Sequence, residues 1–401
     1  MTGKVTISDQ GKQFIEKGQL WMYRNNLLTV SDGTEDGDAV QIVDQQGKYL
    51  ASGFYSSCSH IVVRIVSHDP NEEIDEEFFR RRINKAYQYR REVMGEQITN
   101  CRLIYGQSDG LDGLTVDRYN DVLVSQLTCA YMEKHKDMIY RLLKEVLGKD
   151  GEEIRVIYER NDLAARQKEG LEAYKGFYET ADQSVTTVIR ENGIKINVDF
   201  ANGQKTGYFL DQKFNRKYIQ EIAKDRRVMD CFCHTGGFAL NAAKGGASKV
   251  TAVDLSPRAL QLAYENACMN DLEKQIEFVQ ADVFEYLSTV KKGEYDIIIL
   301  DPPAFTKSRR TIDHAYQGYL RINQKAMDLL ADGAILVSCS CSRYMEKADF
   351  EKMLKEAADN SNVSLKMMAN RGQSPDHPTI DGDETTSYLK FYVMQIERRA
   401  A

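Results

Sequence analysis

The chain has 401 residues, more than one ordinary domain needs, so we expect two or three domains with separate hydrophobic cores. Charged residues make up 28% of it and hydrophobic residues 42%, as in globular proteins in water, and no apolar run approaches the ~20 residues of a membrane span. The net charge of -7 argues against non-specific wrapping of nucleic acid but leaves a local basic patch open.

The N-terminus carries no signal for export. Met1–Gln10 lacks the apolar core of a signal peptide, so we expect a cytoplasmic protein that does not associate with a membrane. In that compartment the eight cysteines are expected to be reduced thiols.

The first section, residues 1–70, is predicted to be a small β domain with a short helix at Lys12–Lys17. Its expected strands are Asn26–Val30, Ala39–Val43, Tyr49–Phe54 and Ile61–Val66. Short strands with tight turns favour a small barrel. The order helix, G-x-x-W, G-D-x-V, D-x-x-G, A-x-G-F-Y and I-x-V-R resembles a PUA domain, an RNA-binding module. The pattern alone establishes only a small β domain.

Residues 71–187 are predicted to form a small α+β domain that opens with a basic helix, Asp75–Val93. This helix carries Arg80, Arg81 and Arg82, which we expect to contact RNA. The alternative is a solvated surface, because Glu76, Glu77 and Glu92 offset the positive charge. The remaining expected elements are a hairpin of Gly113–Arg118 and Val122–Thr128, a helix Met132–Leu147 and a strand Ile154–Glu159.

Residues 188–401 are predicted to form a Rossmann-like α/β domain around the βαβ unit Val228–Asp254. A buried strand leads into a sharp turn at Gly236-Gly237, and the next strand ends at Asp254. A carboxylate there, roughly 20 residues after the turn, can accept the ribose hydroxyls of a nucleoside cofactor. The turn lacks the G-x-G-x-x-G of a dinucleotide site and favours the amino-acid end of S-adenosylmethionine (AdoMet). A glycine turn without a ligand is the alternative.

Alternating strands and helices complete this domain. Its further expected elements are a hairpin of Thr187–Ile189 and Ile194–Val198, a helix that begins at Pro257 after an N-cap at Ser256, strands at Ile276–Gln280, Tyr295–Leu300 and Ile335–Ser338, and a long helix that reaches Leu330. Val363–Met367 and Leu389–Ile396 have no obvious helix between them, so they should pair antiparallel.

Polar residues follow several of these strands, and the carboxyl ends of parallel strands form the ligand edge of such a sheet. Asp254 is expected to bind the ribose, and Asp282 with Val283 the adenine. Asp301-Pro302-Pro303-Ala304-Phe305 lies where a target base would enter. Any single aspartate could instead be a helix cap, but successive acidic strand ends favour a site.

The fifth strand runs into Ser338-Cys339-Ser340-Cys341-Ser342, and alternation places Cys339 and Cys341 on one face with Cys341 nearer the cofactor edge. A thiolate that adds to C6 of cytosine makes C5 nucleophilic enough to accept a methyl group. The alternatives are small buried thiols in a strand, or a metal site with Cys231, Cys233 and His234. The C-x-C spacing argues against zinc, and we expect no metal.

Four motifs behind the PUA-like start carry a family resemblance: KTGYFLDQ at Lys205–Gln212, DCFCHTGGF at Asp230–Phe238, DPPAF at Asp301–Phe305 and SCSCS at Ser338–Ser342. Together they resemble the RlmI-type ribosomal RNA large-subunit methyltransferases, which form 5-methylcytosine. The resemblance covers essentially the whole chain. It implies an AdoMet-dependent enzyme that acts on large-subunit (23S) ribosomal RNA.

The resemblance assigns roles by motif. Cys341 matches the nucleophile of the family, and Asp301 would hydrogen-bond or protonate N3 of the cytosine, next to Pro302, Pro303 and Phe305. The residues implied to line the AdoMet pocket are Gln212, Phe232, Gly237, Phe238, Asp254, Ser256, Asp282 and Val283. Ala304 stands where related enzymes often carry a second cysteine.

Two other functions remain open. Asp-Pro-Pro followed by an aromatic also resembles the motif of enzymes that methylate a base nitrogen, although here the aromatic comes one place late. The third reading is a non-catalytic RNA-binding or ribosome-assembly factor, against which the intact acidic strand ends argue. The target nucleotide and the oligomeric state are left open, with a homodimer among the alternatives.

Overall fold

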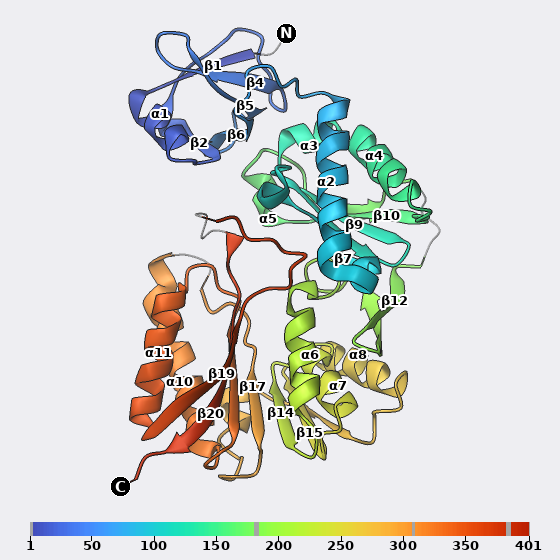
Figure 1. Cartoon of the computed structure of the whole chain (residues 1–401), viewed down its shortest axis with the longest axis vertical. Coiled ribbons are helices and arrows are strands. Elements are labelled where there is room, and N and C mark those ends of the chain that lie inside the picture. The colour runs from blue at the N-terminus through green and yellow to red at the C-terminus, as the bar shows by residue number, and fades with distance from the viewer. Residues whose placement is uncertain (1–2, 180–183, 307–308, 382–385, 401) are drawn as a thin grey trace. The chain divides into compact units, whose positions relative to one another are not determined.

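The computed structural model describes residues 3–179, 184–306, 309–381 and 386–400 (Figure 1). The chain forms two compact units. Unit 1 contains Met1–Thr187, Val198–Tyr208 and Pro375–Pro378, and unit 2 contains Val188–Asn197, Phe209–Ser374 and Thr379–Ala401. Two short segments of the second half of the chain are therefore part of unit 1.

The N-terminal part of unit 1 is a six-stranded sheet in the order β2-β6-β5-β4-β1-β3. Its strands are β1 (Gly3–Ile7), β2 (Trp21–Tyr23), β3 (Leu27–Val30), β4 (Ala39–Val43), β5 (Tyr49–Tyr55) and β6 (Ile61–Ser67), with α1 (Asp9–Glu16) and η1 (Arg24–Asn26) between them. Alternate residues such as Val5, Ile7, Val40 and Ile42 form its core. The sequence predicts neither β1 nor β2: β2 has three residues, and β1 pairs with the distant β4.

The second part of unit 1 is a five-stranded sheet in the order β11-β10-β9-β8-β7. Its strands are β7 (Asn100–Tyr105), β8 (Leu114–Tyr119), β9 (Val122–Leu127), β10 (Val156–Asn161) and β11 (Tyr174–Phe177). Its helical segments are α2 (Glu76–Met94), η2 (Gly95–Thr99), η3 (Gly106–Asp109), α3 (Ala130–Lys134), α4 (Lys136–Gly148) and α5 (Ala164–Gln167). The sequence predicts the hairpin β8–β9 and, within two residues, α2, but it predicts no β7, β11 or α5.

The single helix predicted at Met132–Leu147 is wrong. The chain forms α3 and α4, which meet at His135. The ring of His135 stacks on Tyr131 with 4.1 Å between centroids, and its Nδ1 lies 2.9 Å from the carbonyl oxygen of Tyr131. This contact satisfies a carbonyl at the end of α3 and takes the backbone of His135 out of the helical region.

Buried ion pairs connect the two sheets of unit 1. Arg64 on β6 lies 2.9 Å from Asp112 and 2.7 Å from Glu169, and Trp21 Nε1 also donates to Asp112 at 2.7 Å. Loss of one partner would leave a buried charge uncompensated. The N-terminal sheet is therefore integral to the stability of unit 1.

Unit 2 is built on a seven-stranded sheet in the order β16-β15-β14-β17-β18-β20-β19. Its strands are β14 (Arg227–Cys231), β15 (Lys249–Asp254), β16 (Ile276–Gln280), β17 (Ile297–Leu300), β18 (Ile335–Ser340), β19 (Val363–Arg371) and β20 (Lys390–Arg398). Strands β14 to β18 are parallel, and β20 is antiparallel to both β18 and β19. The predicted hairpin before this sheet is β12 (Thr186–Glu191) with β13 (Ile194–Asp199).

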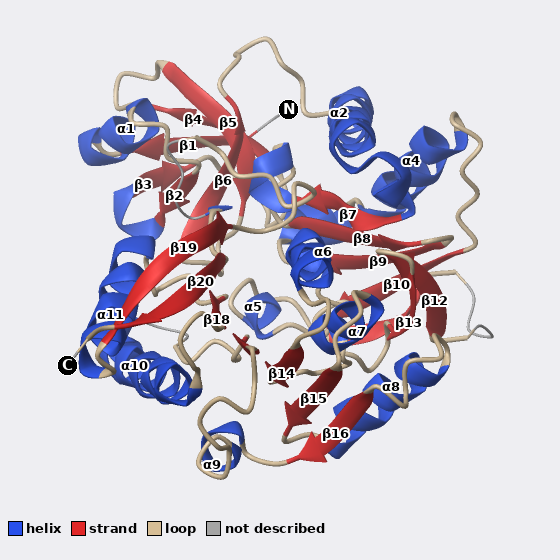
Figure 2. Cartoon of the chain, turned by 60° about the horizontal axis from the view of Figure 1, so that its bottom comes forward, coloured by secondary structure: helices blue, strands red, loops and turns tan. Residues whose placement is uncertain are grey.

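Helices cover both faces of this sheet, with α7 and α8 on one side and α10 and α11 on the other (Figure 2). The helical segments of unit 2 are η4 (Leu210–Gln212), α6 (Lys213–Ile222), α7 (Gly237–Lys244), α8 (Pro257–Cys268), α9 (Val283–Tyr286), η5 (Arg309–Thr311), α10 (Ile312–Leu329) and α11 (Lys347–Asn360). The core on the α10 and α11 side includes Met229, Ile298, Leu336, Tyr319 and Phe350.

Three features of unit 2 differ from the sequence prediction. The sequence predicts no α11, although Phe350, Met353, Leu354, Ala357 and Ala358 are buried at helical spacing and could have indicated it. Strand β18 ends at Ser340, so Cys341 lies one residue past the strand instead of on the same strand face as Cys339. The four-residue α9 was too short to be predicted from periodicity.

Candidate functional site

The parallel strands of unit 2 bring the predicted site residues to one edge of the sheet. Cys231 at the end of β14 is in register with Val253 on β15 and Leu300 on β17, and Leu300 is in register with Ser338 on β18. The residues that follow these strands are therefore neighbours in space. Asp254, Asp282, Asp301 and Cys341 all lie at or just after these strand ends.

The glycine turn after β14 is tightly wound. Phe232, His234 and Gly236 have positive φ angles of 63°, 51° and 83°. A Cβ on Gly236 would lie 3.1 Å from Cβ of Ala263, so both the angle and the space favour glycine. Gly237 then begins α7, and the buried Phe238 stacks on Phe391 with 6.0 Å between ring centroids.

Asp254 is held between this turn and α8. Its Oδ2 accepts the N–H of His234 at 2.9 Å, and its Oδ1 accepts the N–H of Ser256 at 2.9 Å. Ser256 in turn caps α8, since its Oγ accepts the N–H of Ala259 at 3.2 Å. Each carboxylate oxygen can accept more than one hydrogen bond, so this fixed, half-buried carboxylate can also accept ribose hydroxyls.

Asp230 lies inside β14, and the sequence pattern assigns no role to it. Its Oδ2 accepts the N–H of Ala239 on α7 at 2.8 Å. Among the described residues, no group hydrogen-bonds its buried Oδ1. Burial, together with the charges of Asp301 and Asp254, holds the pKa of Asp230 well above its usual range. A cationic group of a ligand next to the glycine turn would favour the ionised carboxylate and could use its unsatisfied oxygen as an acceptor.

Asp282 is a helix cap as well as a strand-end residue. Its Oδ1 accepts the N–H groups of Phe284 at 2.8 Å and Glu285 at 3.2 Å, which starts α9. Val283, the first residue of α9, is buried. The helix-cap reading considered from the sequence is thus correct for Asp282, whose side chain is half-buried.

Asp301 follows β17 and contacts Gln212 of η4. Gln212 Nε2 donates to Asp301 Oδ2 at 3.3 Å, and Gln212 Oε1 accepts from Asn215 Nδ2 at 2.6 Å. Gln212 is 4% exposed, so this amide holds Asp301 from the buried side. Of the next two residues, Pro302 is buried and Pro303 is exposed.

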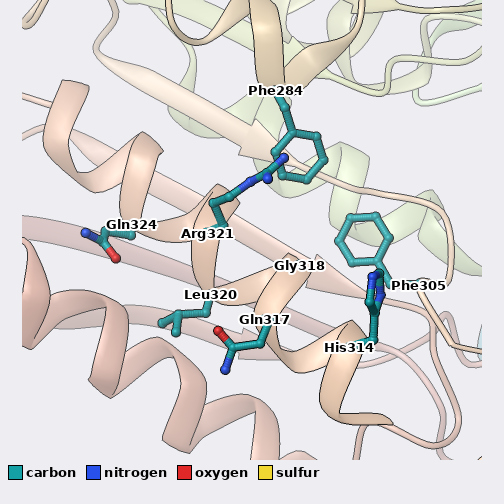
Figure 3. Close-up of a pocket in the computed structure, with 8 residues that line it drawn as sticks. All are labelled: Phe284, Phe305, His314, Gln317, Gly318, Leu320, Arg321 and Gln324. Carbon is teal, nitrogen blue, oxygen red and sulfur yellow. The ribbon is translucent and has the colours of Figure 1, made fainter. Parts of the chain in front are cut away.

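Phe305 forms part of the wall of a cavity of ≈570 Å³ beside α10 (Figure 3). Its ring lies 4.7 Å from that of Tyr319 and 6.3 Å from that of Phe284, measured between centroids. A Cβ on Gly318 would come within 3.2 Å of the Phe305 ring, so glycine allows this approach. Arg321 covers the other ring, with its guanidinium carbon 4.3 Å from the centroid of Phe284.

The two cysteines after β17 in the chain have different environments. Cys339 is fully buried, and burial holds the pKa of its thiol well above the usual range. Cys341 is half-buried beyond the strand end. Burial is the main cause that raises the pKa of the Tyr319 hydroxyl on α10, and negative charges on Cys341 and Asp301 raise this pKa further. That hydroxyl accepts a hydrogen bond from Ser340 Oγ at 3.0 Å.

The predicted RNA contacts Arg80, Arg81 and Arg82 belong to α2 of unit 1 and all have acidic partners. Arg80 pairs with Glu76 at 2.8 Å and with Glu145 at 2.5 Å. Arg82 donates to the carbonyl oxygens of Gly110 and Val66 and is mostly buried. Arg81 pairs with Glu72, and its side chain is 54% exposed, the largest exposure of the three.

Two family models match the chain. Residues 176–392 match S-adenosylmethionine-dependent methyltransferases, and residues 5–68 match a PUA-like domain. Ribosomal RNA large subunit methyltransferase I of Aeromonas hydrophila is 40% identical over 94% of this chain and 94% of that protein. The same-named protein of Shewanella denitrificans is 38% identical over 99% of this chain and 100% of that protein. The chain belongs to the ribosomal RNA large subunit methyltransferase I family.

Solved structures agree in fold. A methyltransferase from Streptococcus mutans gives a TM-score of 0.81 at 21% identity over 98% of this chain and 100% of that one. Another methyltransferase structure, complexed with SAH, gives a TM-score of 0.82. The predicted Rossmann-like class I methyltransferase sheet, the PUA-like domain and the AdoMet cofactor are confirmed. Within the described ranges, no helix is long and apolar enough to cross a membrane.

The residues at the strand ends fit this cofactor. AdoMet carries ribose hydroxyls and a positively charged amino group, and unit 2 offers the fixed carboxylate of Asp254 and the buried Oδ1 of Asp230. The tight turn at Gly236 lets the backbone approach a ligand closely. The sequence pattern predicted Asp254 and the turn as parts of the pocket, whereas it did not indicate Asp230, whose burial only the structure shows.

Proposed function

We propose that this protein methylates C5 of a cytosine in large-subunit (23S) ribosomal RNA through a covalent bond between Cys341 and C6 of the base. The observation that carries the proposal is the pairing of β17 with β18, which puts Asp301 and Cys341 at adjacent strand ends. An acid and a nucleophile side by side are what addition to a cytosine ring requires. The names of the full-length relatives support ribosomal RNA as the substrate.

In this proposal AdoMet supplies an electrophilic methyl group, and the chain holds it with residues of the strand ends. Asp254 and Ser256 bind the ribose side, and Asp282 with Val283 binds the adenine. The remaining contacts come from Gln212, Phe232, Gly237 and Phe238. The half-buried position of Phe232 and the buried position of Phe238, on either side of the glycine turn, support this assignment.

The chain's own groups then carry the base chemistry. The thiolate of Cys341 adds to C6 as the C5–C6 double bond opens, and Asp301 donates a hydrogen bond or a proton to N3. C5 becomes enamine-like and accepts the methyl group. The C5 proton then leaves to a base, the double bond forms again, and the C6–S bond breaks to release Cys341. Gln212 keeps Asp301 directed toward the base.

We infer that Pro302, Pro303 and Phe305 line the place of the target base. The aromatic ring of Phe305 at the wall of the cavity beside α10 supports a contact with RNA, because bases outside a helix stack on such rings. The PUA-like domain and Arg80, Arg81 and Arg82 would add affinity for RNA without chemistry, in a cytoplasmic enzyme. In this scheme residues 1–70, 71–187 and 188–401 are the RNA-binding, middle and catalytic domains.

An RNA substrate that carries 5-fluorocytosine tests the nucleophile. This base has no C5 proton to lose after methyl transfer, so the bond to Cys341 should persist and yield a protein–RNA species that survives denaturation. The species should require AdoMet, disappear in Cys341→Ala and remain in Cys339→Ala. A denaturing gel with labelled RNA measures it.

Two results would redirect the proposal. Methyl transfer by Cys341→Ala without any adduct would favour methylation of a base nitrogen through Asp301-Pro302-Pro303. Adduct loss only in Cys339→Ala would move the nucleophile into β18. Nucleoside mass mapping of ribosomal RNA from cells with and without the gene identifies the product directly.

A further inference from the structure

Lys390 is a buried cation beside the proposed nucleophile. It begins β20, and the antiparallel register pairs it with Ser340, the residue before Cys341. Lys390 is only 7% exposed. A buried ammonium group costs free energy unless other groups compensate for its lost hydration. The position of Lys390 therefore needs an explanation.

Two hydrogen bonds direct the ammonium group toward the turn after β18. Lys390 Nζ donates to the carbonyl oxygen of Ser342 at 2.6 Å and to that of Tyr388 at 2.8 Å. Ser342 follows Cys341 directly, so the ammonium holds the backbone on one side of the nucleophile while β18 holds the other. In the described part of the chain, Lys390 makes no ion pair with a carboxylate.

Among the described residues, the titratable and charged groups near this turn include Asp301, Tyr319 and Cys339, as well as Arg343, two residues after Cys341, and Tyr388, whose hydroxyl pairs with Asp211. Asp301 follows β17, Tyr319 belongs to α10, and Cys339 lies on β18. Burial raises the pKa of both Tyr319 and Cys339, and negative charges on Asp301 and Cys341 raise both pKa values further. Asp301 disfavours a second negative charge at Cys341, which makes a nearby cation more necessary for a thiolate.

We propose that Lys390 is a positioning residue of this site, whose ammonium group stabilises the thiolate of Cys341 and fixes the turn that carries it. Burial lowers the pKa of Lys390 to about 8, while a negative charge on Cys341 acts in the opposite direction. With a pKa of about 8, the ammonium group is mostly protonated at neutral pH. The use of the thiolate in catalysis rests on the proposed function; the charge effect itself does not.

The sign of the pH effect follows from these groups. Below about pH 8 the ammonium attracts the thiolate and increases the reactive fraction of Cys341. As the pH rises further, Lys390 loses its proton and this advantage disappears. Replacement by arginine, which stays protonated, should preserve the advantage at high pH.

Alkylation of the full-length protein by iodoacetamide at pH 6 to 10 tests the proposal. The thiolate sulfur displaces iodide, and the thiol proton goes to the buffer, so the rate reports the thiolate fraction. Peptide mass spectrometry separates Cys341 from the exposed Cys268, which serves as an internal control. In Lys390→Met, alkylation of Cys341 should be about tenfold slower at pH 7 and approach the parent rate near pH 10. The rate at Cys268 should not change.

Lys390→Arg provides the rescue and an independent arm. In this variant iodoacetamide should alkylate Cys341 at the parent rate near pH 7 and faster than in the parent above pH 8. AdoMet affinity measured by calorimetry shows whether each variant is folded. Identical Cys341 profiles in the parent and Lys390→Arg across the whole range would overturn the proposal even if Lys390→Met does not fold.

The other overturning results have distinct signatures. A slowing in Lys390→Met that is equal at every pH would mean that Lys390 controls access to Cys341 and not its charge. An unchanged profile would mean that Lys390 has no influence on the thiol. Failure of the 5-fluorocytosine adduct with a normal alkylation effect would remove the cytosine-C5 function but leave the Lys390 proposal intact.

Discussion

Asp254 shows how one residue can be both structural and functional. Its two carboxylate oxygens fix the backbone of His234 in the glycine turn and of Ser256 at the start of α8. These bonds also fix the carboxylate, so it pays little conformational entropy when a ligand binds. The same carboxylate therefore serves the turn and the next helix, and in the proposed function it also serves the cofactor.

Asp254→Ala should weaken AdoMet binding by about 1–3 kcal/mol, because the ribose hydroxyls lose their acceptor and two backbone N–H groups lose theirs. Isothermal calorimetry with AdoMet measures the change. Asp328→Ala, which removes an exposed carboxylate near the end of α10, is the matched control and should bind normally. Unchanged affinity in Asp254→Ala, or tighter binding of NAD than of AdoMet to the parent, would contradict the pocket assignment.

At the scale of elements, the turn between β14 and α7 depends on its backbone conformation more than on its side chains. Three residues with positive φ reverse the chain within five positions, and α7 packs close to α8 at Gly236. Phe232 and His234 adopt this conformation although neither is glycine, which costs of order 1 kcal/mol or more for each. Strain of this kind is expected where a turn is shaped for a ligand.

Gly236→Ala should destabilise this element. A methyl group there would meet Ala263 at 3.1 Å and force a left-handed conformation on a non-glycine residue, at a cost of about 1–2 kcal/mol in the free energy of unfolding. The loss in the free energy of AdoMet binding should be larger than the loss in the free energy of unfolding, because in the proposed function the turn also shapes the AdoMet pocket. Urea unfolding with and without AdoMet separates the two effects.

Gly333→Ala is the control for that experiment. Gly333 also has a positive φ, 77°, but a Cβ there would meet no atom within 4 Å. It should therefore lose stability without a specific loss of AdoMet affinity. Equal effects of both substitutions on AdoMet binding would show that the turn at Gly236 has no special role in the pocket.

At the scale of the whole molecule, the proposed function assigns RNA affinity to unit 1 and chemistry to unit 2. Deletion of residues 1–69 would not test RNA binding alone. It would also destabilise unit 1, since Asp112 and Glu169 would lose their buried partner Arg64. Arg81 is better suited, because its partner Glu72 gives an exposed ion pair that contributes little to stability.

Arg81→Ala should weaken RNA binding and reduce the salt dependence by about one phosphate contact, while AdoMet affinity stays unchanged. Filter binding of a ribosomal RNA fragment at several salt concentrations measures both. Arg155→Ala, which removes another exposed, ion-paired arginine of unit 1, is the control. The same salt slope in both variants and the parent would place the RNA contact elsewhere.

The sequence by itself determined the elements whose signal is local. Strands β4 and β16 have the predicted bounds, α8 begins at the predicted Ser256-Pro257 cap, and the acidic ends of β15, β16 and β17 were visible as polar residues after apolar runs. Their physical causes, turn chemistry, capping and burial of short apolar strands, act within a few residues and can be read in order along the chain.

Only the tertiary structure decided features that depend on contacts distant in sequence. Strand β1 forms by pairing with β4, and α3 and α4 separate at His135, which packs on Tyr131. The raised pKa of Asp230 results mainly from its burial. Lys390 comes beside the proposed nucleophile Cys341, 49 residues earlier in the chain, because β20 runs antiparallel beside β18. Register between strands, which no local pattern encodes, places the charges of this site.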